Sequence, residues 1–435
     1  MIMRKIYLKT MLAVLLSAFA LVSCEKEQVE AFDKSATERL NERIEEIKTI
    51  LTSNEEGWIM KYYIGSEQSG GGFIYTLKFT GSEAEVGFEY AETAFHYDVD
   101  TTITSLYKIA DDNGPVLSFD TYNDFIHYFS TPSSSYYQAL GGDFEFEIHD
   151  VSEERITMIG RRSRNTIVLE PLSQPGTEYI AGVVAMSKSF NPYYLEGMAG
   201  TETVSGTIDY SARQINIDTA GGHVSCAFCF TPSGISLYEP VELGGVEIQN
   251  LAYDQQSMKL TAGSVDIQGS VPEDWVPYDD YEGSYLLKYA TNFTADVTLT
   301  PGVYNSTYIL SGLNKNFTIE LQYNMQTGKL VLNSQMVGTV DGYSIYFCAW
   351  ALDSGGSVTW APTAGMQTVW NGDKENAVYT FESNGYVWRT ASGAKCVTDS
   401  FILFAIGDEI FYYNEASWGT NGFAQWPYIE SLTKK

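Results

Sequence analysis

The sequence has few basic residues: 26 lysines and arginines are set against 55 aspartates and glutamates, and the formal net charge is −29 at pH 7. A surface of that sign repels the phosphate backbone of nucleic acids and the anionic faces of membranes. Loss of an N-terminal segment containing Arg4, Lys5 and Lys9 would make the charge −32, because 23 basic residues would then face the same 55 acidic ones. We therefore expect no nucleic-acid partner.

Histidine is also scarce. His96, His127, His149 and His223 are the whole set, and neither H-E-x-x-H nor G-x-S-x-G occurs. Those motifs hold a catalytic zinc or carry a nucleophilic serine. A histidine-based catalytic centre thus has few candidate residues, and we expect a protein that is not an enzyme and has no cofactor and no metal site.

Cysteine is limited to five residues, and two of them form the C-x-x-C pair Cys226 and Cys229. The surrounding HVSCAFCF is typical of a strand, which would place the two thiols on opposite faces and about 10 Å apart, too far for a mutual disulfide. A zinc site would need a second closely spaced pair, which the sequence lacks. Two alternatives remain: buried free thiols, or one bridge from this pair to Cys348 or Cys396.

The apolar run Met11 to Val22 is too short to span a bilayer and follows a basic start, as in a signal peptide over residues 1–23. It ends in Leu-Val-Ser-Cys24, which resembles the bacterial lipobox. In that family the signal is cut before the cysteine, whose thiol then carries a lipid. The resemblance implies an anchor on Cys24 that holds firmly, at about 0.8 kcal/mol per buried CH₂.

The acidic residues directly after the lipobox are a second targeting signal. Glu25, Glu27 and Glu30 resemble the acidic export tag of Bacteroidetes surface lipoproteins. That resemblance implies a lipid anchor in the outer membrane, with the protein facing the cell exterior.

Aromatic residues, at 14%, are abundant and favour sheet over helix. A capping box at Ser35 to Glu38 predicts one short amphipathic helix, and from Trp58 onward apolar residues alternate with a period of two. We expect an all-β fold after that helix, with two or three barrel- or sandwich-like antiparallel domains. The expected segments are the signal peptide at 1–23, a lipidated tether at 24–34, the helix with a first β domain at 35–172, a second β region at 173–270 that is separate from or continuous with the first, a linker at 271–283 and a Trp-rich β domain at 284–435.

Gly57-Trp58 resembles the opening of a lipocalin, and calycin-like barrels fit the pattern. Lipocalins have one residue between the glycine and the tryptophan, whereas here the two are adjacent, so the match predicts architecture rather than a ligand cavity. The stretch Glu282 to Tyr289 repeats this acid-glycine-aromatic start, which suggests a second domain of similar build. Gly70-Gly71-Gly72 lacks the helix and the Gly-Lys-Ser/Thr of a phosphate loop and predicts a hairpin turn.

Several stretches together resemble one known family. They are the lipobox, the capped helix, TSNEEGW (52–58), LSFDTYNDFIHYFSTP (117–132), GGDFEFEI (141–148) and TPSGISLYEP (231–240). These stretches resemble a family of Bacteroidetes surface lipoproteins that is described only as a domain of unknown function. The resemblance covers most of residues 24–430 and implies association with SusC/SusD-type uptake systems, but no catalytic residues.

Six of the eight tryptophans lie from residue 350 onward. Trp360 and Trp370 bracket a loop-like stretch, and together with Trp388 they are our candidate ligand-binding residues, because indole faces suit sugar rings and peptide side chains. The alternative is that they pack in the core. We expect a non-enzymatic binding or accessory lipoprotein that captures a glycan or peptide for a SusC/SusD-type transporter.

Two other functions stay open. Asp143, Glu145 and Glu147 fall on one face of an expected strand, and a carboxylate-dependent hydrolase could use two of them. A structural or adhesive surface lipoprotein without a small ligand would instead bury its tryptophans.

Overall fold

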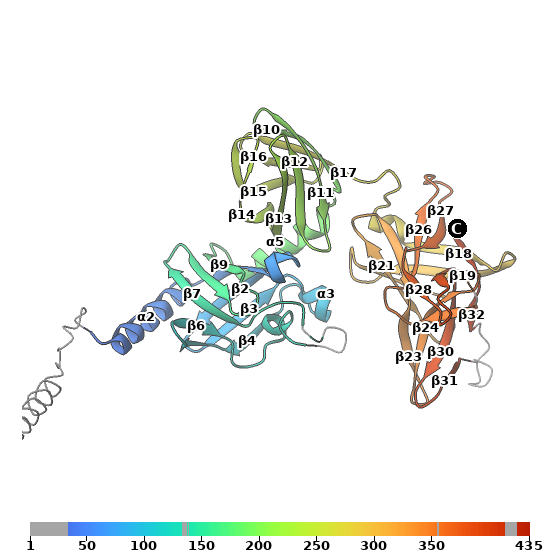
Figure 1. Cartoon of the computed structure of the whole chain (residues 1–435), viewed down its shortest axis with the longest axis horizontal. Coiled ribbons are helices and arrows are strands. Elements are labelled where there is room, and N and C mark those ends of the chain that lie inside the picture. The colour runs from blue at the N-terminus through green and yellow to red at the C-terminus, as the bar shows by residue number, and fades with distance from the viewer. Residues whose placement is uncertain (1–33, 133–136, 138, 355, 414–423) are drawn as a thin grey trace, which may run out of the picture.

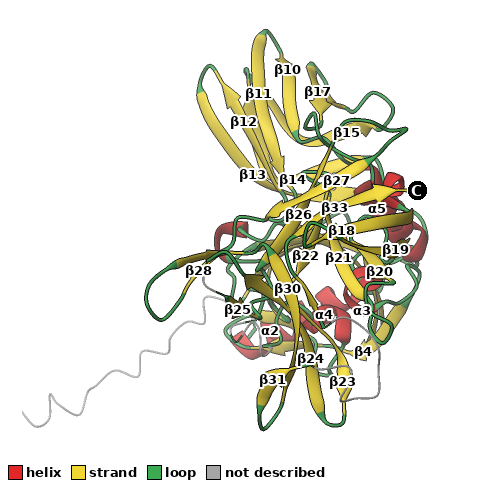
Figure 2. Ribbon diagram, turned by 90° about the vertical axis from the view of Figure 1, so that its right-hand side faces the viewer, coloured by secondary structure: helices red, strands yellow, loops and turns green. Residues whose placement is uncertain are grey.

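The computed structural model describes residues 34–132, 137, 139–354, 356–413 and 424–435. Over these residues the chain forms three β units (Figure 1), and the helices are few and short (Figure 2). The strands pair antiparallel and two of the units are closed barrels, so the all-β fold expected from the sequence is confirmed. No helix in the described ranges has both the length and the apolar content to cross a bilayer.

Helix α2 (Ala36–Leu51) begins at the capping box that the sequence predicts. The Glu38 N–H donates to Ser35 Oγ at 3.2 Å, and the Ser35 N–H donates to Glu38 Oε2 at 2.9 Å. Its apolar stripe, including Ile47, is buried against the first unit. The helix ends at Leu51, whose carbonyl accepts the indole N–H of Trp58 at 2.9 Å. Trp58 therefore fixes the end of α2 to the first strand.

The first unit is an open nine-stranded sheet, the N-terminal sheet, in the order β4-β3-β2-β1-β9-β8-β7-β6-β5. Its elements are β1 (Trp58–Tyr63), η1 (Ser66–Gln68), β2 (Gly72–Thr80), β3 (Glu83–Phe88), α3 (Ala91–Phe95), β4 (Thr102–Leu106), β5 (Lys108–Asp111), β6 (Pro115–Ser118), α4 (Asp124–His127), β7 (Glu145–Val151), β8 (Ile156–Gly160) and β9 (Thr166–Pro171). Side chains from both ends of the sheet share one core with α2 and α4. The sheet therefore wraps around its core without closing.

Helix α5 (Gly176–Ser189) lies between the first unit and the second (Figure 1). Its buried residues Ile180 and Val183 share one core with Ile74 on β2 and with the strands of the second unit. The predicted hairpin turn at Gly70-Gly71-Gly72 connects β1 to β2, which pair directly. Gly71 has φ +77°, and a Cβ there would lie 2.4 Å from the Cβ of Arg213. The glycines thus let the turn approach the second unit closely.

The second unit, the first barrel, is closed by consecutive strands. They are β10 (Tyr194–Ala199), β11 (Glu202–Asp209), β12 (Gln214–Thr219), β13 (Gly222–Thr231), β14 (Gly234–Leu243), β15 (Val246–Asp254), β16 (Lys259–Ala262) and β17 (Val265–Ser270). β10 pairs with both β11 and β17, which closes the ring.

The third unit, the second barrel, is also closed. Its strands are β18 (Gly283–Tyr289), β19 (Phe293–Pro301), β20 (Thr307–Ser311), β21 (Ile319–Asn324), β22 (Lys329–Asn333), β26 (Gly365–Trp370), β27 (Val378–Ser383) and β33 (Ile429–Lys434). The stretch before it, expected as a linker, contains the 3-10 helix η2 (Tyr278–Tyr281), and Tyr278 and Tyr281 are buried in the barrel core. The sequence gives no signal for this packed segment, because its prolines and acidic residues do not alternate with apolar ones as in a strand.

A six-stranded sheet extends from the second barrel and shares its core. It is formed by β23 (Gln335–Val340), β24 (Tyr343–Ala351), β25 (Ser357–Thr359), β30 (Ser400–Ile406), β31 (Ile410–Tyr412) and β32 (Gln425–Trp426), and a separate pair is formed by β28 (Val387–Arg389) and β29 (Lys395–Val397). In both views β23, β24, β30 and β31 lie at the end of the unit away from the first barrel (Figures 1 and 2).

Candidate functional site

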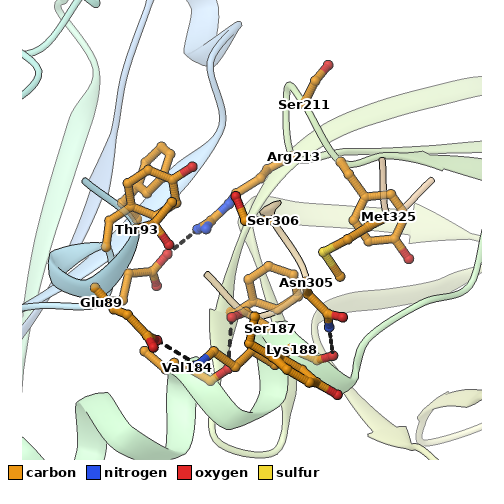
Figure 3. Close-up of a pocket in the computed structure, with 16 residues that line it drawn as sticks. Glu89, Thr93, Val184, Ser187, Lys188, Ser211, Arg213, Asn305, Ser306 and Met325 are labelled. Carbon is orange, nitrogen blue, oxygen red and sulfur yellow. Dashed lines mark hydrogen bonds and ion pairs between the residues drawn. The ribbon is translucent and has the colours of Figure 1, made fainter. Parts of the chain in front are cut away.

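A pocket of about 240 Å³, the junction pocket, lies where all three β units meet (Figure 3). The N-terminal unit contributes Phe73, Glu89, Tyr90, Glu92 and Thr93, α5 contributes Val184, Ser187 and Lys188, the first barrel contributes Tyr210, Ser211, Arg213 and Phe230, and the second barrel contributes Tyr304, Asn305, Ser306 and Met325. A pocket of that volume suits one sugar ring or one amino-acid side chain.

Arg213 reaches the junction pocket from the turn between β11 and β12. Asp209 shapes this turn, because its Oδ1 accepts the backbone N–H of Ser211 at 2.9 Å and that of Ala212 at 3.1 Å. Arg213 then adopts a left-handed φ of 46°, and its side chain points toward the N-terminal sheet (Figure 3). Local turn chemistry therefore sets the direction of the guanidinium.

The guanidinium of Arg213 has polar partners at Nη1 and an aromatic ring at two further positions. It forms an ion pair with Glu89, and Nη1 donates to the carbonyl of Gly72 at 2.6 Å. Its central carbon lies 4.1 Å from the ring centroid of Phe73 and 5.0 Å from that of Phe230. Arg213 and Glu89 are both buried. This pair links the first barrel to the N-terminal sheet inside the pocket wall.

Glu89 uses both carboxylate oxygens. One faces Arg213, and Oε2 accepts the backbone N–H of Ile74 at 3.2 Å. Burial raises the pKa of the Glu89 carboxyl above its ordinary value, and the neighbouring Arg213 opposes that rise. A carboxylate held on both oxygens is a structural ion-pair partner rather than a free acid or base for chemistry in the pocket.

Lys188, in the last turn of α5, connects the second barrel to the rest of the molecule. Its Nζ lies 2.6 Å from Glu92 on α3 and 5.5 Å from the ring centroid of Tyr304. Its carbonyl accepts a hydrogen bond from the side-chain amide of Asn305. The loop between β19 and β20 therefore contacts the C-terminal end of α5 through a charge on a ring and a hydrogen bond.

The rest of the lining combines aromatic faces with uncharged polar groups. Tyr90 packs edge-on against Phe73, with ring centroids 5.7 Å apart. The uncharged polar residues in the wall are Thr93, Ser187, Ser211, Asn305 and Ser306. Aromatic faces with a few convergent hydroxyl and amide groups are typical of sites for small polar ligands that have an apolar side.

The tryptophans predicted to bind ligand lie outside this pocket. Trp360 follows β25 and is 49% exposed, while the indole N–H of Trp388 donates to Ser357 Oγ at 3.0 Å on the same strand. Trp370, on β26, is half-buried against the core of the second barrel, and its indole N–H is buried without a partner. The structure thus places Trp388 beside the strand that precedes Trp360, and it places Trp370 against the core.

The predicted acidic strand face is only partly correct. β7 begins at Glu145, so Asp143 lies before the strand, where its carboxylate is buried and accepts the N–H of Arg162 at 2.5 Å and that of Ser163 at 3.2 Å. Glu147 pairs with Arg164 at 3.0 Å. A glycine pair and a turn before β7 pull Asp143 out of the strand register. Cys24, the predicted lipidation site, lies outside the described residues.

The remaining cysteines are free thiols. Cys226, Cys229, Cys348 and Cys396 are buried and unbridged, which decides between the two alternatives left open by the sequence. Burial raises the pKa of Cys229 to about 11 and that of Cys348 to about 12, so neither thiol is activated. Within the described ranges, no three His, Cys, Asp or Glu side chains are grouped closely enough to hold a metal ion.

Sequence reasoning did not find the residues of the junction pocket. Glu89, Lys188 and Arg213 come from three separate elements and have no common spacing. The one available signal was the scarcity of basic residues. Because lysines and arginines are few, each one that lies between two strands or at a helix end is a candidate for a specific role.

Comparison with known protein families assigns the chain to one of them. No curated protein matches it. Residues 259–404 match the family model described as a domain of unknown function, DUF4987. A second model, described as a domain of unknown function (DUF4302), matches residues 28–255, and the two matches meet between β15 and β16 of the first barrel. Because the DUF4302 model covers 228 of the 435 residues (255 − 28 + 1), more than half, the chain belongs to the DUF4302 family.

Proposed function

We propose that this protein is a non-enzymatic binding lipoprotein of the bacterial outer surface. A lipid on Cys24 anchors it to the outer membrane, and the described units capture a glycan or peptide fragment for a SusC/SusD-type transporter. The junction pocket is the single observation that carries the binding role. It is lined by aromatic rings and uncharged polar groups from three units.

Binding is favoured over catalysis by the state of the carboxylates in the pocket. Hydrolysis of a glycosidic bond needs a pair of carboxyl groups that are free to give and take protons or to attack the sugar. Glu89 is held by Arg213 and a backbone N–H, and Glu92 is paired with Lys188. These ion pairs suit a fixed wall that a ligand contacts without reacting.

The location rests on the N-terminal sequence. The basic start, the short apolar run and the Leu-Val-Ser-Cys24 stretch support lipidation, and the glutamates after Cys24 support export to the outer face. The resemblance to Bacteroidetes surface lipoproteins supports a role beside an uptake system. A captor on the cell exterior would raise the local concentration of nutrient fragments at the transporter.

Binding is tested with the mature chain produced without its lipid, residues 25–435, on arrays of glycans and short peptides. We expect a ligand whose binding weakens by about tenfold or more in Tyr304→Ala, because that ring forms part of the pocket wall. Trp360→Ala is the matched control, since it removes an exposed aromatic outside the pocket. A chain that binds no array member, or one that loses binding in Trp360→Ala and keeps it in Tyr304→Ala, would contradict this site.

A further inference from the structure

We infer that the junction pocket takes one uncharged, hydroxyl-rich ring and that the chain attached to this ring continues into a neighbouring groove. The ligand class is therefore the end of a neutral oligosaccharide. This inference rests on the proposed function and narrows it to one chemistry and one mode of binding.

The charges of the pocket are already paired with one another. Arg213 is matched by Glu89 and Lys188 by Glu92, so each cation in the lining has its own carboxylate. A ligand with a formal charge would have to displace one of these partners or remain uncompensated. That is costly at the buried Arg213–Glu89 pair and less so at Lys188–Glu92, whose side chains are 29% and 37% exposed. A neutral ligand leaves both pairs intact and uses only their remaining hydrogen-bonding capacity.

The uncharged part of the lining matches the two-sided character of a sugar ring. Pyranose rings present C–H groups on their faces and hydroxyls around their rims. Tyr90 and Tyr304 offer aromatic surface for the faces, and Asn305, Ser306 and Thr93 offer amide and hydroxyl groups for the rim. The volume of about 240 Å³ admits one such ring.

A second hollow adjoins the junction pocket. This outer groove, of about 830 Å³, shares Glu92, Val184 and Lys188 with the junction pocket, so the Lys188–Glu92 ion pair stands where the two meet. The outer groove is the more open of the two and is lined between α3 and α5 by residues that include Tyr97 and Thr177. In the proposed binding mode, the chain attached to the seated ring runs past the ion pair along this groove.

The negative charge of the outer groove further narrows the class of ligand. Asp98, Asp100 and Glu178 line it beside Glu92, with Lys188 as the cation. These carboxylates would repel a chain of uronic acids or sulfated sugars and would not oppose a neutral one. Room for one ring in the inner pocket, with the outer groove beside it, fits the end of a chain better than an internal residue.

The test is a calorimetric titration of the lipid-free mature chain with neutral trimers of glucose, mannose, galactose, xylose and N-acetylglucosamine, with trigalacturonate and with trilysine. We expect at least one neutral trimer to bind, its monomer to bind about tenfold more weakly, and its hexamer to bind with the affinity of the trimer because each chain offers the same end. Binding of trigalacturonate or trilysine without any neutral trimer would overturn the inference and leave the proposed function standing. A hexamer that binds in proportion to its length would overturn the end-on mode. A protein that binds none of these probes would overturn the inference, and the proposed function would fail with it only if no member of the glycan and peptide arrays bound either.

Substitution of Lys188 tests whether the paired charges, rather than the shape of the pocket, select the ligand. Lys188→Gln leaves Glu92 without its partner at the point where pocket and groove meet. We expect the neutral trimer to weaken by about fivefold or less and the affinity for the glucosamine trimer, a polyamine, to rise by about tenfold. Lys374→Gln is the matched control, because Lys374 is well exposed and lies outside both hollows. An unchanged preference in Lys188→Gln would contradict the role of paired charges in selection.

Discussion

The two barrels share one architecture and fill it with different side chains. Aliphatic residues line both cores. Their aromatic residues differ: the first barrel adds phenylalanines and Tyr253, whereas the second adds many tyrosines, among them Tyr278, Tyr281, Tyr285, Tyr308, Tyr323 and Tyr379. In both barrels, the segment just before the first strand places aromatic side chains in the core, and we call these side chains the plug of the barrel. Phe190, directly after α5, packs on Phe230 with ring centroids 5.4 Å apart, and η2 supplies the tyrosines of the second barrel.

The plugs are held by different forces. The hydroxyl of a buried tyrosine needs a hydrogen-bond partner, and in the second barrel backbone carbonyls are the acceptors. Tyr281 donates to Gly328 O at 2.9 Å, Tyr308 donates to Tyr278 O at 2.6 Å, and Tyr323 donates to Val276 O at 2.8 Å. These bonds fix the upstream segment in direction and register, whereas Phe190 is held through its ring by packing alone.

This difference explains why neither barrel interior is our candidate site. Side chains fill both interiors, as expected for small barrels rich in large residues. The junction pocket instead lies between units, where packing leaves irregular space. A small barrel can thus serve as a wall of a binding site rather than as its container.

Alkaline pH gives the largest expected contrast between the barrels. Burial raises the pKa of Tyr278 and of Tyr379 in the second barrel to about 12, above the ordinary value near 10. The folded state therefore holds more protons than the unfolded state between those pH values, and stability is lost as pH rises through this window. At about 1.4 kcal/mol per pKa unit for each tyrosine, several such groups would unfold the second barrel. The first barrel has fewer tyrosines whose pKa is raised by burial, chiefly Tyr210 and Tyr253.

The measurement is an alkaline titration followed by tryptophan emission and by β-sheet ellipticity. The first barrel contains no tryptophan, so a red shift of the emission reports the other units, and chiefly the second barrel. We expect the red shift to precede the full loss of ellipticity. A single transition in which both signals change together would mean that the tyrosine core confers no special alkaline sensitivity.

Truncation of one plug residue is the next largest effect. Tyr281→Ala removes a ring that is 1% exposed and should lower the free energy of unfolding of the second barrel by about 3–5 kcal/mol. Tyr281→Phe keeps the ring and should cost about 1–3 kcal/mol, because Gly328 O loses its donor. Urea unfolding followed by tryptophan emission measures both. Equal losses in the two variants would show that the hydroxyl, and not the packing, holds the plug.

The elements that the sequence predicted well are those fixed by neighbouring residues. The capping box located α2, the period of two located the strands, and the repeated acid-glycine-aromatic start marked the first strand of two units. Trp58 and Tyr285 are both fully buried there, and each donates to a carbonyl of the preceding segment, Leu51 O and Tyr281 O respectively. Local patterns of this kind need no knowledge of the rest of the chain.

The parts that the sequence did not reveal depend on contacts between distant residues. The stretch 271–283 is predicted only as a linker, because a 3-10 turn with buried tyrosines has no repeating pattern. The junction pocket joins Glu89 to Arg213, which are 124 residues apart. Trp370 carried the right residue type for a binding role, but its place against a core is set by strand pairing. Such features follow from the fold rather than from spacing.

The smallest expected effect concerns how each barrel is attached. The first barrel is joined to the N-terminal sheet by the buried Arg213–Glu89 pair, whereas the second is joined to α5 through Asn305 and the Lys188–Tyr304 contact. Asn305→Ala removes one partly buried hydrogen bond and should cost about 0.5–1.5 kcal/mol without unfolding either barrel. Proteolysis between the barrels, at residues 271–275, should therefore become faster while the urea transition of the second barrel keeps its midpoint. If the urea midpoint moved instead, the Asn305 amide would stabilise the second barrel itself, and its docking would depend on the contact between Lys188 and Tyr304.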